Sequence, residues 1–291
     1  MSRFAYIYNP AARFGKTGNK LRKLKRHVRD QPDADFYRSK KKGDISPLVS
    51  ELLSEYDVFV ACGGDGTVRE IAEVLIKTDK LLGIIPLGTG NDLCKTLGIP
   101  VELGRSLSVV RQLKATPIDV GRCGSSIFLN SLGFGFDGLT NRLAYELQNL
   151  PPFLRYATAA VKAALRQAPF SVHIKREGGA SKKELLMISF ANGKIEGGSF
   201  WIAPEASITD GKLDMVTISP LNRWLIPVLL PLILFKKGHL IPQLATRKLT
   251  SVTLEFDGDI EIHADGEIIR TDRKTFEIGI MPKALNVICG L

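Results

Sequence analysis

The feature that most constrains the fold is an apolar run that ends in three glycines and continues at helical spacing. Residues 58–62 are apolar and predict a buried strand. Gly63, Gly64 and Gly66 follow at once, and glycine lets a backbone adopt positive φ and approach a ligand closely. From Thr67 onward, apolar residues recur at helical intervals. This order of strand, glycine turn and helix N-terminus presents backbone N–H groups that can bind a phosphate.

One carboxylate, Asp65, lies inside this turn. A carboxylate repels a bound phosphate unless a divalent cation stands between them or the carboxylate handles a proton, and both are roles in phosphoryl transfer. Taken alone, the pattern is equally consistent with an ordinary tight turn. A second turn, Gly88-Thr89-Gly90-Asn91-Asp92, follows the apolar strand pattern of residues 81–86. Two such units predict neighbouring parallel strands whose turns share one edge, where open α/β sheets bind ligands.

Composition limits the class of protein. With 291 residues, 44% of them apolar, the chain is long enough for two domains with separate cores. The four cysteines are far apart and form no Cys-x-x-Cys, so we expect neither a zinc knuckle nor a disulfide framework. The four histidines are scattered and indicate no His/Cys metal cluster. Because Met1-Ser2-Arg3 leads directly into a strand pattern, we expect no signal peptide and a cytoplasmic protein.

The formal net charge of +10 is concentrated near the N-terminus. Residues 1–42 hold thirteen Lys and Arg against three Asp, which accounts for the whole excess. Such a run is consistent with a solvated helix face, an anionic membrane surface, a nucleotide or nucleic acid. Each Lys or Arg close to an anionic leaflet contributes about 1 kcal/mol, so a few of them would hold the protein loosely on a bilayer.

Three motifs together resemble the diacylglycerol kinase catalytic-domain family of lipid kinases, which is distantly similar to NAD kinases and 6-phosphofructokinases. They are the two glycine turns and Asp265-Gly266-Glu267, and the resemblance runs from Asn9-Pro10 to the C-terminal strand. It implies an α/β nucleotide-binding domain over residues 1–122 with a returning segment, 283–291. An antiparallel β-sandwich domain for the lipid substrate is expected over residues 123–282, where period-two strand patterns outnumber helices. The expected strands of this domain are 127–132, 170–174, 185–191, 212–218, 249–256, 260–263 and 275–280, and one more strand is expected before it, over 116–121.

The resemblance implies roles for those residues that match the motifs of the family. The expected ATP-binding residues are Asn9, Gly63, Gly64, Gly66, Thr67, Gly88 and Thr89. Asp65 is expected to hold the catalytic Mg²⁺, while Asp210 binds a structural Mg²⁺ that is linked through water to Asp92 and Asp119. Glu267 is the expected general base for the acceptor hydroxyl, with Asp265 as a helper at the nucleotide or metal. The Ser-Gly that the family carries after Asn-Pro is absent, so Arg13 and Lys16 are candidates for the serine's role.

Spacing alone leaves plainer alternatives open for three of these acids. Asp119 could lie on an exposed strand face, Asp210-Gly211 could be an ordinary turn, and Asp265-Gly266 could be a hairpin turn.

Two interpretations also remain for the apolar stretch 224–235. It has two prolines and is too short to span about 30 Å of hydrocarbon. It is therefore either a buried helical hairpin or an interfacial element that dips into lipid.

The expected function is therefore an ATP- and Mg²⁺-dependent lipid kinase that phosphorylates the hydroxyl of a diacylglycerol-like lipid at an anionic membrane surface. One alternative is NAD phosphorylation, although the second turn differs from the Asn-Glu motif expected of NAD kinases. Another is a non-catalytic protein that binds an anionic membrane or nucleic acid. We expect no nucleic-acid partner, because no helix-turn-helix, zinc finger or RNP pattern is present and the acids at 65, 265 and 267 would serve no purpose there. The identity of the lipid and the formation of a homodimer stay open.

Overall fold

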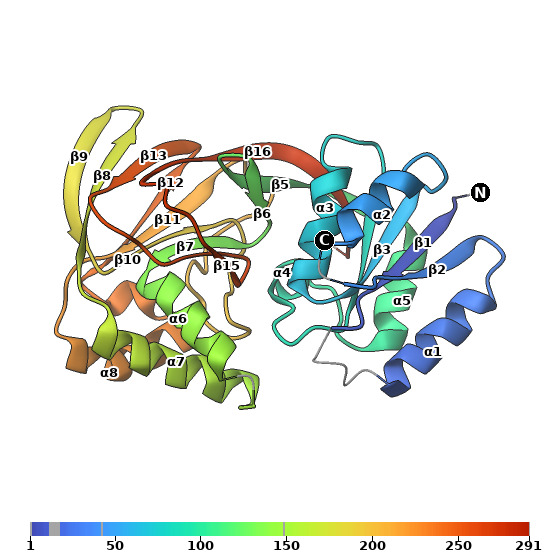
Figure 1. The fold of residues 1–291 in the computed structure, drawn as a ribbon, viewed down its shortest axis with the longest axis horizontal. Helices are drawn as coiled ribbons and strands as arrows, with labels where there is room; N and C mark the ends of the chain where they lie inside the picture. The colour runs from blue at the N-terminus through green and yellow to red at the C-terminus, as the bar shows by residue number, and fades with distance from the viewer. Residues whose placement is uncertain (1, 12–17, 42, 148, 291) are drawn as a thin grey trace. The chain divides into compact units, whose positions relative to one another are not determined.

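The computed structural model describes residues 2–11, 18–41, 43–147 and 149–290, which fold into two compact units (Figure 1). Unit 1 comprises Met1–Ile118 and Lys283–Leu291, and unit 2 comprises Asp119–Pro282. Arg13 and Lys16, the candidates for the role of the missing serine, lie outside the described residues.

Unit 1 is built on a parallel sheet with the strand order β2-β1-β3-β4. The strands are β1 (Phe4–Tyr8), β2 (Ala34–Arg38), β3 (Val58–Gly63) and β4 (Leu81–Pro86). Tyr8 lies opposite Cys62, and Gly63 lies opposite Pro86, so the strands end together. Both glycine turns therefore leave adjacent strands at one edge of the sheet, as the sequence predicts. The sequence analysis did not identify β2.

Helices cover both faces of this sheet (Figure 1). They are α1 (Gly18–Arg29), α2 (Ile45–Leu52), α3 (Asp65–Leu75), α4 (Asp92–Thr96) and α5 (Leu103–Gln112). Leu24 of α1 and Val110 of α5 pack in one core cluster with Tyr6 and Val60 of the sheet, whereas α2 and α3 lie on the other face. The apolar stripe of α3 is buried as its spacing predicts, from Val68 to Leu75.

Unit 2 is a β-sandwich, which confirms the predicted fold class of its domain. Its six-stranded sheet has the order β12-β11-β10-β7-β14-β15 and is antiparallel. These strands are β7 (Ser131–Gly135), β10 (Met187–Ala191), β11 (Leu213–Ile218), β12 (Leu244–Leu249), β14 (Ile262–Ala264) and β15 (Glu267–Ile269). The facing strands include β8 (Phe170–Arg176), β9 (Gly179–Leu185), β13 (Ser251–Phe256) and the first part of β16 (Thr275–Ile288). Phe134, Phe190, Phe256 and Phe276 pack between the two layers.

Some predicted strand boundaries differ from the structure. The expected strand over 127–132 is divided between β6 (Ser126–Phe128) and β7, and β12 precedes the strand expected over 249–256. The strand expected over 275–280 and the returning segment form one continuous strand, β16, which pairs with β13 in unit 2 and with β4 in unit 1. The strand expected over 116–121 is β5 (Ala115–Cys123), which pairs with β6.

Three helices cover the outer face of the six-stranded sheet: α6 (Phe136–Glu146), α7 (Pro152–Arg166) and α8 (Ile226–Leu234). Short 3₁₀ turns, Arg223–Leu225 and Gly238–Leu240, flank α8. The stretch 224–235 is thus a single helix with its flanks, and the interpretation as a buried hairpin is wrong. Ile226 and Ile233 are buried, whereas Trp224, Val228 and Phe235 are 70%, 69% and 72% exposed. Among the described residues, no helix is both long and apolar enough to cross a membrane.

Candidate functional site

The two glycine turns of unit 1 are held against each other by the backbone. The N–H groups of Leu87 and Gly88 both donate to the carbonyl oxygen of Gly63, at 2.8 and 3.0 Å. A Cβ on Gly64 would lie 3.1 Å from the Cα of Gly88, and a Cβ on Gly88 would overlap Gly64. Gly64, the N-cap of α3, has φ −99°, so these glycines are required for space rather than for positive φ. Bare backbone at a helix N-terminus is suited to bind phosphate oxygens.

Asn9 ties the end of β1 to the first turn. Its amide Nδ2 donates to Oγ1 of Thr67 at 3.0 Å, and its Oδ1 accepts from the N–H of Ala11 at 2.9 Å. Its own N–H donates to the carbonyl of Cys62 at 3.2 Å. A side chain at Gly63 would overlap Thr67. The structure therefore brings Asn9, Gly63 and Thr67 of the predicted ATP-binding set to one strand edge.

Asp65 and Asp92 each begin a helix and converge beside Gly90. A Cβ on Gly90 would lie 3.2 Å from Oδ2 of Asp65 and 3.5 Å from Oδ2 of Asp92. Asp65 also accepts from the N–H of Leu93 at 3.4 Å, and Lys95 lies 3.6 Å from Asp92. Two hard carboxylate ligands over a residue without a side chain fit Mg²⁺. From the sequence these two acids were expected at different ions, whereas the fold makes them neighbours.

Asp119 in unit 2 is fully buried, so its alternative placement on an exposed strand face is wrong. Its Oδ2 accepts from the N–H of Gly211 at 2.6 Å, which joins it to the Asp210-Gly211 turn. Asp210 itself is paired with Lys248 at 2.8 Å, and Lys248 also lies 3.0 Å from Asp214. Burial lowers the pKa of Lys248, but the hydrogen bonds to Asp210 and Asp214 and the charges of these two carboxylates together raise it above its ordinary value. A cation bound at Asp210 must therefore share this carboxylate with a charged ammonium.

The Asp265-Gly266-Glu267 segment forms the tight turn between β14 and β15, with φ of 50° at Asp265 and 79° at Gly266. Both oxygens of Asp265 accept from backbone N–H groups: Oδ2 from Leu129 at 2.8 Å, and Oδ1 from Asn130 at 2.8 Å and Ser131 at 3.0 Å. Asp265 thus fixes this turn to the segment that enters β7. Glu267 is half-buried at the start of β15.

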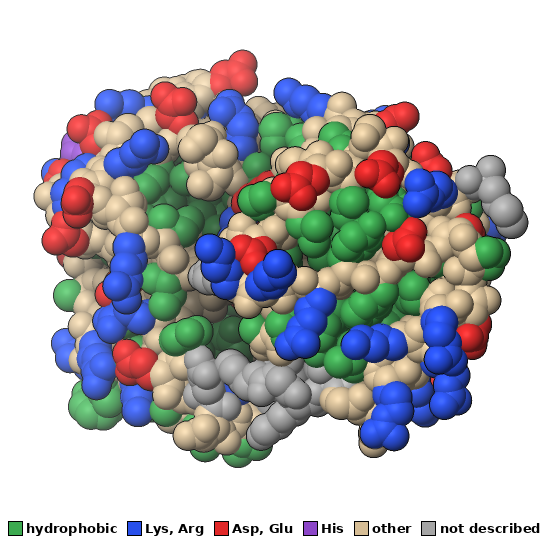
Figure 2. Space-filling view, turned by 45° about the vertical axis from the view of Figure 1, so that its right-hand side comes forward, with side chains coloured by type: hydrophobic (Ala, Val, Ile, Leu, Met, Phe, Trp, Pro, Cys, Tyr) green, Lys and Arg blue, Asp and Glu red, His purple; other side chains and the backbone are tan. Residues whose placement is uncertain are grey.

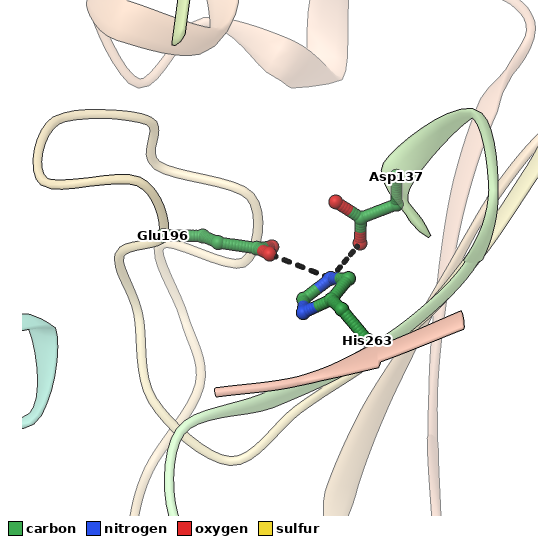
Figure 3. Close-up of side chains that lie close together, drawn as sticks. All are labelled: Asp137, Glu196 and His263. Atoms are coloured by element: carbon green, nitrogen blue, oxygen red, sulfur yellow. Dashed lines mark ion pairs between the residues drawn. The ribbon is translucent and has the colours of Figure 1, made fainter. Parts of the chain in front are cut away.

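A buried cluster of Asp137, Glu196 and His263 was missed by the sequence analysis (Figure 3). Nε2 of His263 lies 2.8 Å from Oε1 of Glu196 and 3.2 Å from Oδ2 of Asp137. The three residues come from β14, from α6 and from the loop before Phe200, so no sequence spacing reveals them. His263 lies opposite Gly133 in the sheet, and a Cβ on Gly133 would overlap both His263 and Asp137.

The two ring nitrogens of His263 face different groups. The N–H of Gly266 points to Nδ1 at 3.3 Å, and Nε2 faces the two carboxylates. Burial lowers the pKa of His263, but the charges of Glu196 and Asp137 and their hydrogen bonds to the ring raise it well above its ordinary value. Burial raises the pKa of Glu196, and the charge of Asp137 raises it further. The cluster is therefore arranged to share protons between its members.

A pocket opens in unit 2 beside this cluster. The space between its lining residues, counted together with the open solvent at its mouth, is about 860 Å³. Most of its wall is apolar and comes from α6, α7, α8 and the strands β10 and β11, whereas Asp137, Asn141 and Glu196 form a polar end. A Cβ on Gly266 would lie 3.6 Å from Oδ1 of Asn141 and 4.0 Å from the hydroxyl of Tyr156, both pocket residues. The polar end thus adjoins the turn that carries Glu267.

Basic side chains are prominent on the surface, and Figure 2 shows Lys and Arg gathered at the lower right of the visible face. Helix α1 contains no acidic residue, and Arg22, Lys23, Lys25, Arg26 and Arg29 are exposed on it. The predicted basic run is therefore a solvent-accessible helix face over this part of its length.

Known proteins resemble both parts of the chain. Residues 3–123 match the family model described as "Diacylglycerol kinase catalytic domain", and residues 130–289 match "YegS C-terminal NAD kinase beta sandwich-like domain". A Pseudomonas putida protein named "Probable lipid kinase YegS-like" is 31% identical over 253 residues, which cover 84% of this chain and 81% of the relative. A "Diacylglycerol kinase" of Mycobacterium tuberculosis is 30% identical over 249 residues, covering 83% and 79%.

The fold also has a solved counterpart. The crystal structure of a diacylglycerol kinase from Bacillus anthracis matches with a TM-score of 0.77 at 23% sequence identity, covering 99% of this chain and 97% of the other. This likeness shows that the two-domain fold is shared. Because these relatives are named as lipid kinases, they favour a kinase and not a non-catalytic binding protein.

Proposed function

The chain belongs to the diacylglycerol kinase catalytic-domain family of lipid kinases, and on that premise we propose that it transfers the γ-phosphate of ATP, with Mg²⁺, to the hydroxyl of a diacylglycerol-like lipid. The observation that carries the lipid acceptor is the apolar pocket of unit 2, whose polar end adjoins the Glu267 turn. A pocket with an apolar wall and a few convergent polar groups is typical of a small-molecule site.

ATP is proposed to bind unit 1 at its two glycine turns. Gly63, Gly64, Gly66 and Thr67 bind the phosphates at the N-terminus of α3, because this backbone is free of obstructing side chains. Asn9, Gly88 and Thr89 are proposed to border the nucleotide, because Asn9 bonds to Thr67 and Gly88 packs against Gly64.

Mg²⁺ is proposed to bind Asp65, with Asp92 as a neighbour whose carboxylate faces the same point beside Gly90. When it is bound, Mg²⁺ offsets negative charge on the phosphates during transfer. A second, structural Mg²⁺ is proposed in unit 2 at Asp210, next to Asp119. Asp119 supports it through its bond to Gly211, and the pairing of Asp210 with Lys248 opposes it.

Glu267 is the proposed general base for the acceptor hydroxyl. A loose transition state requires little deprotonation of the alcohol beforehand, so the position of Glu267 matters more than its basicity. Asp265, the proposed helper, serves this position, because its carboxylate holds the turn through three backbone N–H groups.

Peripheral membrane binding from the cytoplasmic side is proposed for the surface around α8. Trp224, Val228 and Phe235 are exposed there, and Lys236 and Lys237 follow directly. Exposed apolar residues beside basic ones favour the interface of an anionic bilayer.

The test is transfer of ³²P from γ-labelled ATP, with Mg²⁺, to a panel of lipid alcohols in mixed micelles, with NAD as a separate acceptor. Label in a lipid that is lost in Asp65→Ala supports the proposal. Label in NAD alone would establish NAD phosphorylation in its place, and no label in any acceptor at saturating ATP would refute the proposed reaction.

A further inference from the structure

We propose that the cluster of Asp137, Glu196 and His263 recognises the head of the acceptor lipid and selects heads that carry a hydrogen-bond donor besides the hydroxyl to be phosphorylated. The donor is an amine or a second hydroxyl. This inference rests on the proposed lipid kinase activity and specifies its acceptor.

The cluster has a suitable location. Asp137 and Glu196 line the polar end of the pocket, and the remainder of the wall is dominated by Leu, Ile, Val and Phe side chains. A long-chain molecule that places its tail along this wall brings its head to the two carboxylates. The same end adjoins Gly266, one residue before Glu267, so a hydroxyl next to the head comes close to the proposed base.

The cluster has more acceptors than donors. Oδ2 of Asp137, Oε2 of Glu196 and Nε2 of His263 are buried and have no hydrogen-bond partner of good geometry. Nε2 of His263 lies 2.8 Å from Oε1 of Glu196 and 3.2 Å from Oδ2 of Asp137, and Asn141 donates to Glu196 at 3.2 Å, so carboxylate oxygens still remain without a donor. Because buried acceptors without donors are unfavourable, a ligand that brings a donor gains the bond that the protein lacks.

The charge of the polar end leads to the same class of ligand. When both carboxylates are ionised they carry two negative charges, so the cluster stays negative even with one positive charge on His263. None of the described residues that line the pocket is Lys or Arg. A cationic or donor-bearing head is therefore stabilised here, and an anionic head is repelled.

Three lipid classes differ in what they bring to the cluster. The only hydroxyl of a diacylglycerol is the one to be phosphorylated, and its ester groups are acceptors that face other acceptors. A monoacylglycerol keeps a second hydroxyl, and a long-chain amino alcohol brings a charged amine. The expected order of kcat/KM is amino alcohol, then monoacylglycerol, then diacylglycerol.

The test compares kcat/KM for these three lipids in identical mixed micelles, in the wild-type protein and in Glu196→Gln, which keeps the shape of the side chain and removes its charge. The ratio of amino alcohol to diacylglycerol is expected to fall about tenfold or more in Glu196→Gln, because a charge-assisted hydrogen bond is lost. Glu184→Gln, on an exposed residue of β9, is the matched control and should leave the ratio unchanged.

A binding measurement covers the case in which Glu196→Gln does not fold. A long-chain primary amine without a hydroxyl should raise the melting temperature of the wild-type protein, whereas a fatty acid of equal length should not. If the amine and the acid bind equally, or if diacylglycerol is the best substrate with a ratio that Glu196→Gln does not change, the inference is wrong. Stoichiometric Zn²⁺ that is lost in Glu196→Gln would also overturn it, since the cluster would then be a metal site.

These outcomes separate the inference from the proposed function. Phosphorylation of diacylglycerol without selective amine binding would uphold the kinase and reject head recognition. Selective amine binding without phosphorylation of any lipid would uphold head recognition and reject the kinase reaction.

Discussion

The glycine turns of unit 1 and the pocket cluster of unit 2 are polar sites of opposite construction. The turns are made of consecutive residues, and their function depends on bare backbone at a strand edge. The cluster is made of side chains from α6, a loop and β14, which only the packed sandwich brings together. A backbone site is visible in a short motif because its geometry is local. A site made of side chains can draw on residues that are far apart in the sequence, and its geometry then depends on the fold of the whole domain.

The largest expected effect comes from the carboxylate in the first turn. Asp65→Ala should lower kcat by about 10²–10³-fold or more, because the proposed ligand of the catalytic cation is lost. The measurement is ³²P transfer, with circular dichroism as the check on folding. Asp79→Asn, an exposed aspartate of the same unit, should keep wild-type activity. A folded Asp65→Ala protein with near wild-type kcat would remove Asp65 from the site.

Glu267 of unit 2 is expected to affect kcat and not the affinity for ATP. Glu267→Gln should lower kcat by about 10²–10⁴-fold through loss of the proposed base, with ATP affinity unchanged because the proposed nucleotide site is in unit 1. Steady-state kinetics and equilibrium binding of ATP separate the two quantities. Glu277→Gln, on an exposed residue of β16, is the control. A loss of ATP affinity equal to the loss of kcat would contradict this division.

A smaller effect tests whether the glycine turns of unit 1 need close contact between their backbones. Gly88→Ala places a methyl group against Gly64, so the turns must separate. We expect a loss of about 1–3 kcal/mol in the free energy of unfolding and a weaker affinity for ATP. Gly18→Ala, whose added methyl meets nothing within 4 Å, should change neither quantity. Urea titration and ATP binding are the measurements, and unchanged binding in Gly88→Ala would refute the proposed phosphate site.

The exposed surface near α8 gives a test that should leave the pocket intact. Val228→Ser removes an apolar side chain that is 69% exposed. Co-sedimentation with anionic vesicles should fall several-fold, because less apolar surface enters the interface, while activity on a lipid in detergent micelles stays the same. Equal co-sedimentation of the variant and the wild-type protein would exclude this residue from the membrane contact.

The smallest effect concerns a pair that joins β2 to α5 in unit 1. Arg111 donates to Asp33 at 2.8 and 3.2 Å, and these hydrogen bonds lower the pKa of Asp33. The carboxylate therefore stabilises the fold above the unfolded pKa of about 3.9, and this contribution is lost as the pH falls through the lower, folded pKa. Asp33→Asn should cost about 1 kcal/mol at pH 7 and progressively less as the pH falls below about 3.9. Urea titrations across this range measure the change, and a cost that does not vary with pH would disprove the assignment.

The sequence by itself determined the parts whose chemistry is local. Apolar runs that end in glycine predict parallel strands and their turns, because strand, turn and helix start occupy adjacent residues. Period-two patterns predict the sandwich of unit 2. The turn of Asp265-Gly266 was also predictable, since two residues at positive φ suffice to join neighbouring strands.

Only the tertiary structure decided which side chains are buried and which distant residues meet, where the sequence pattern allowed more than one outcome. Asp119 alternates with apolar neighbours and could face solvent, but it is buried because the Gly211 turn packs over it. The stretch 224–235 is uniformly apolar, so the packing of α8 alone selects which side chains are buried and which are exposed. His263 meets Asp137 and Glu196 because Gly133 leaves room opposite it in the sheet. Burial and long-range pairing depend on which surfaces meet, and the order of residues along the chain does not contain that information in any local pattern.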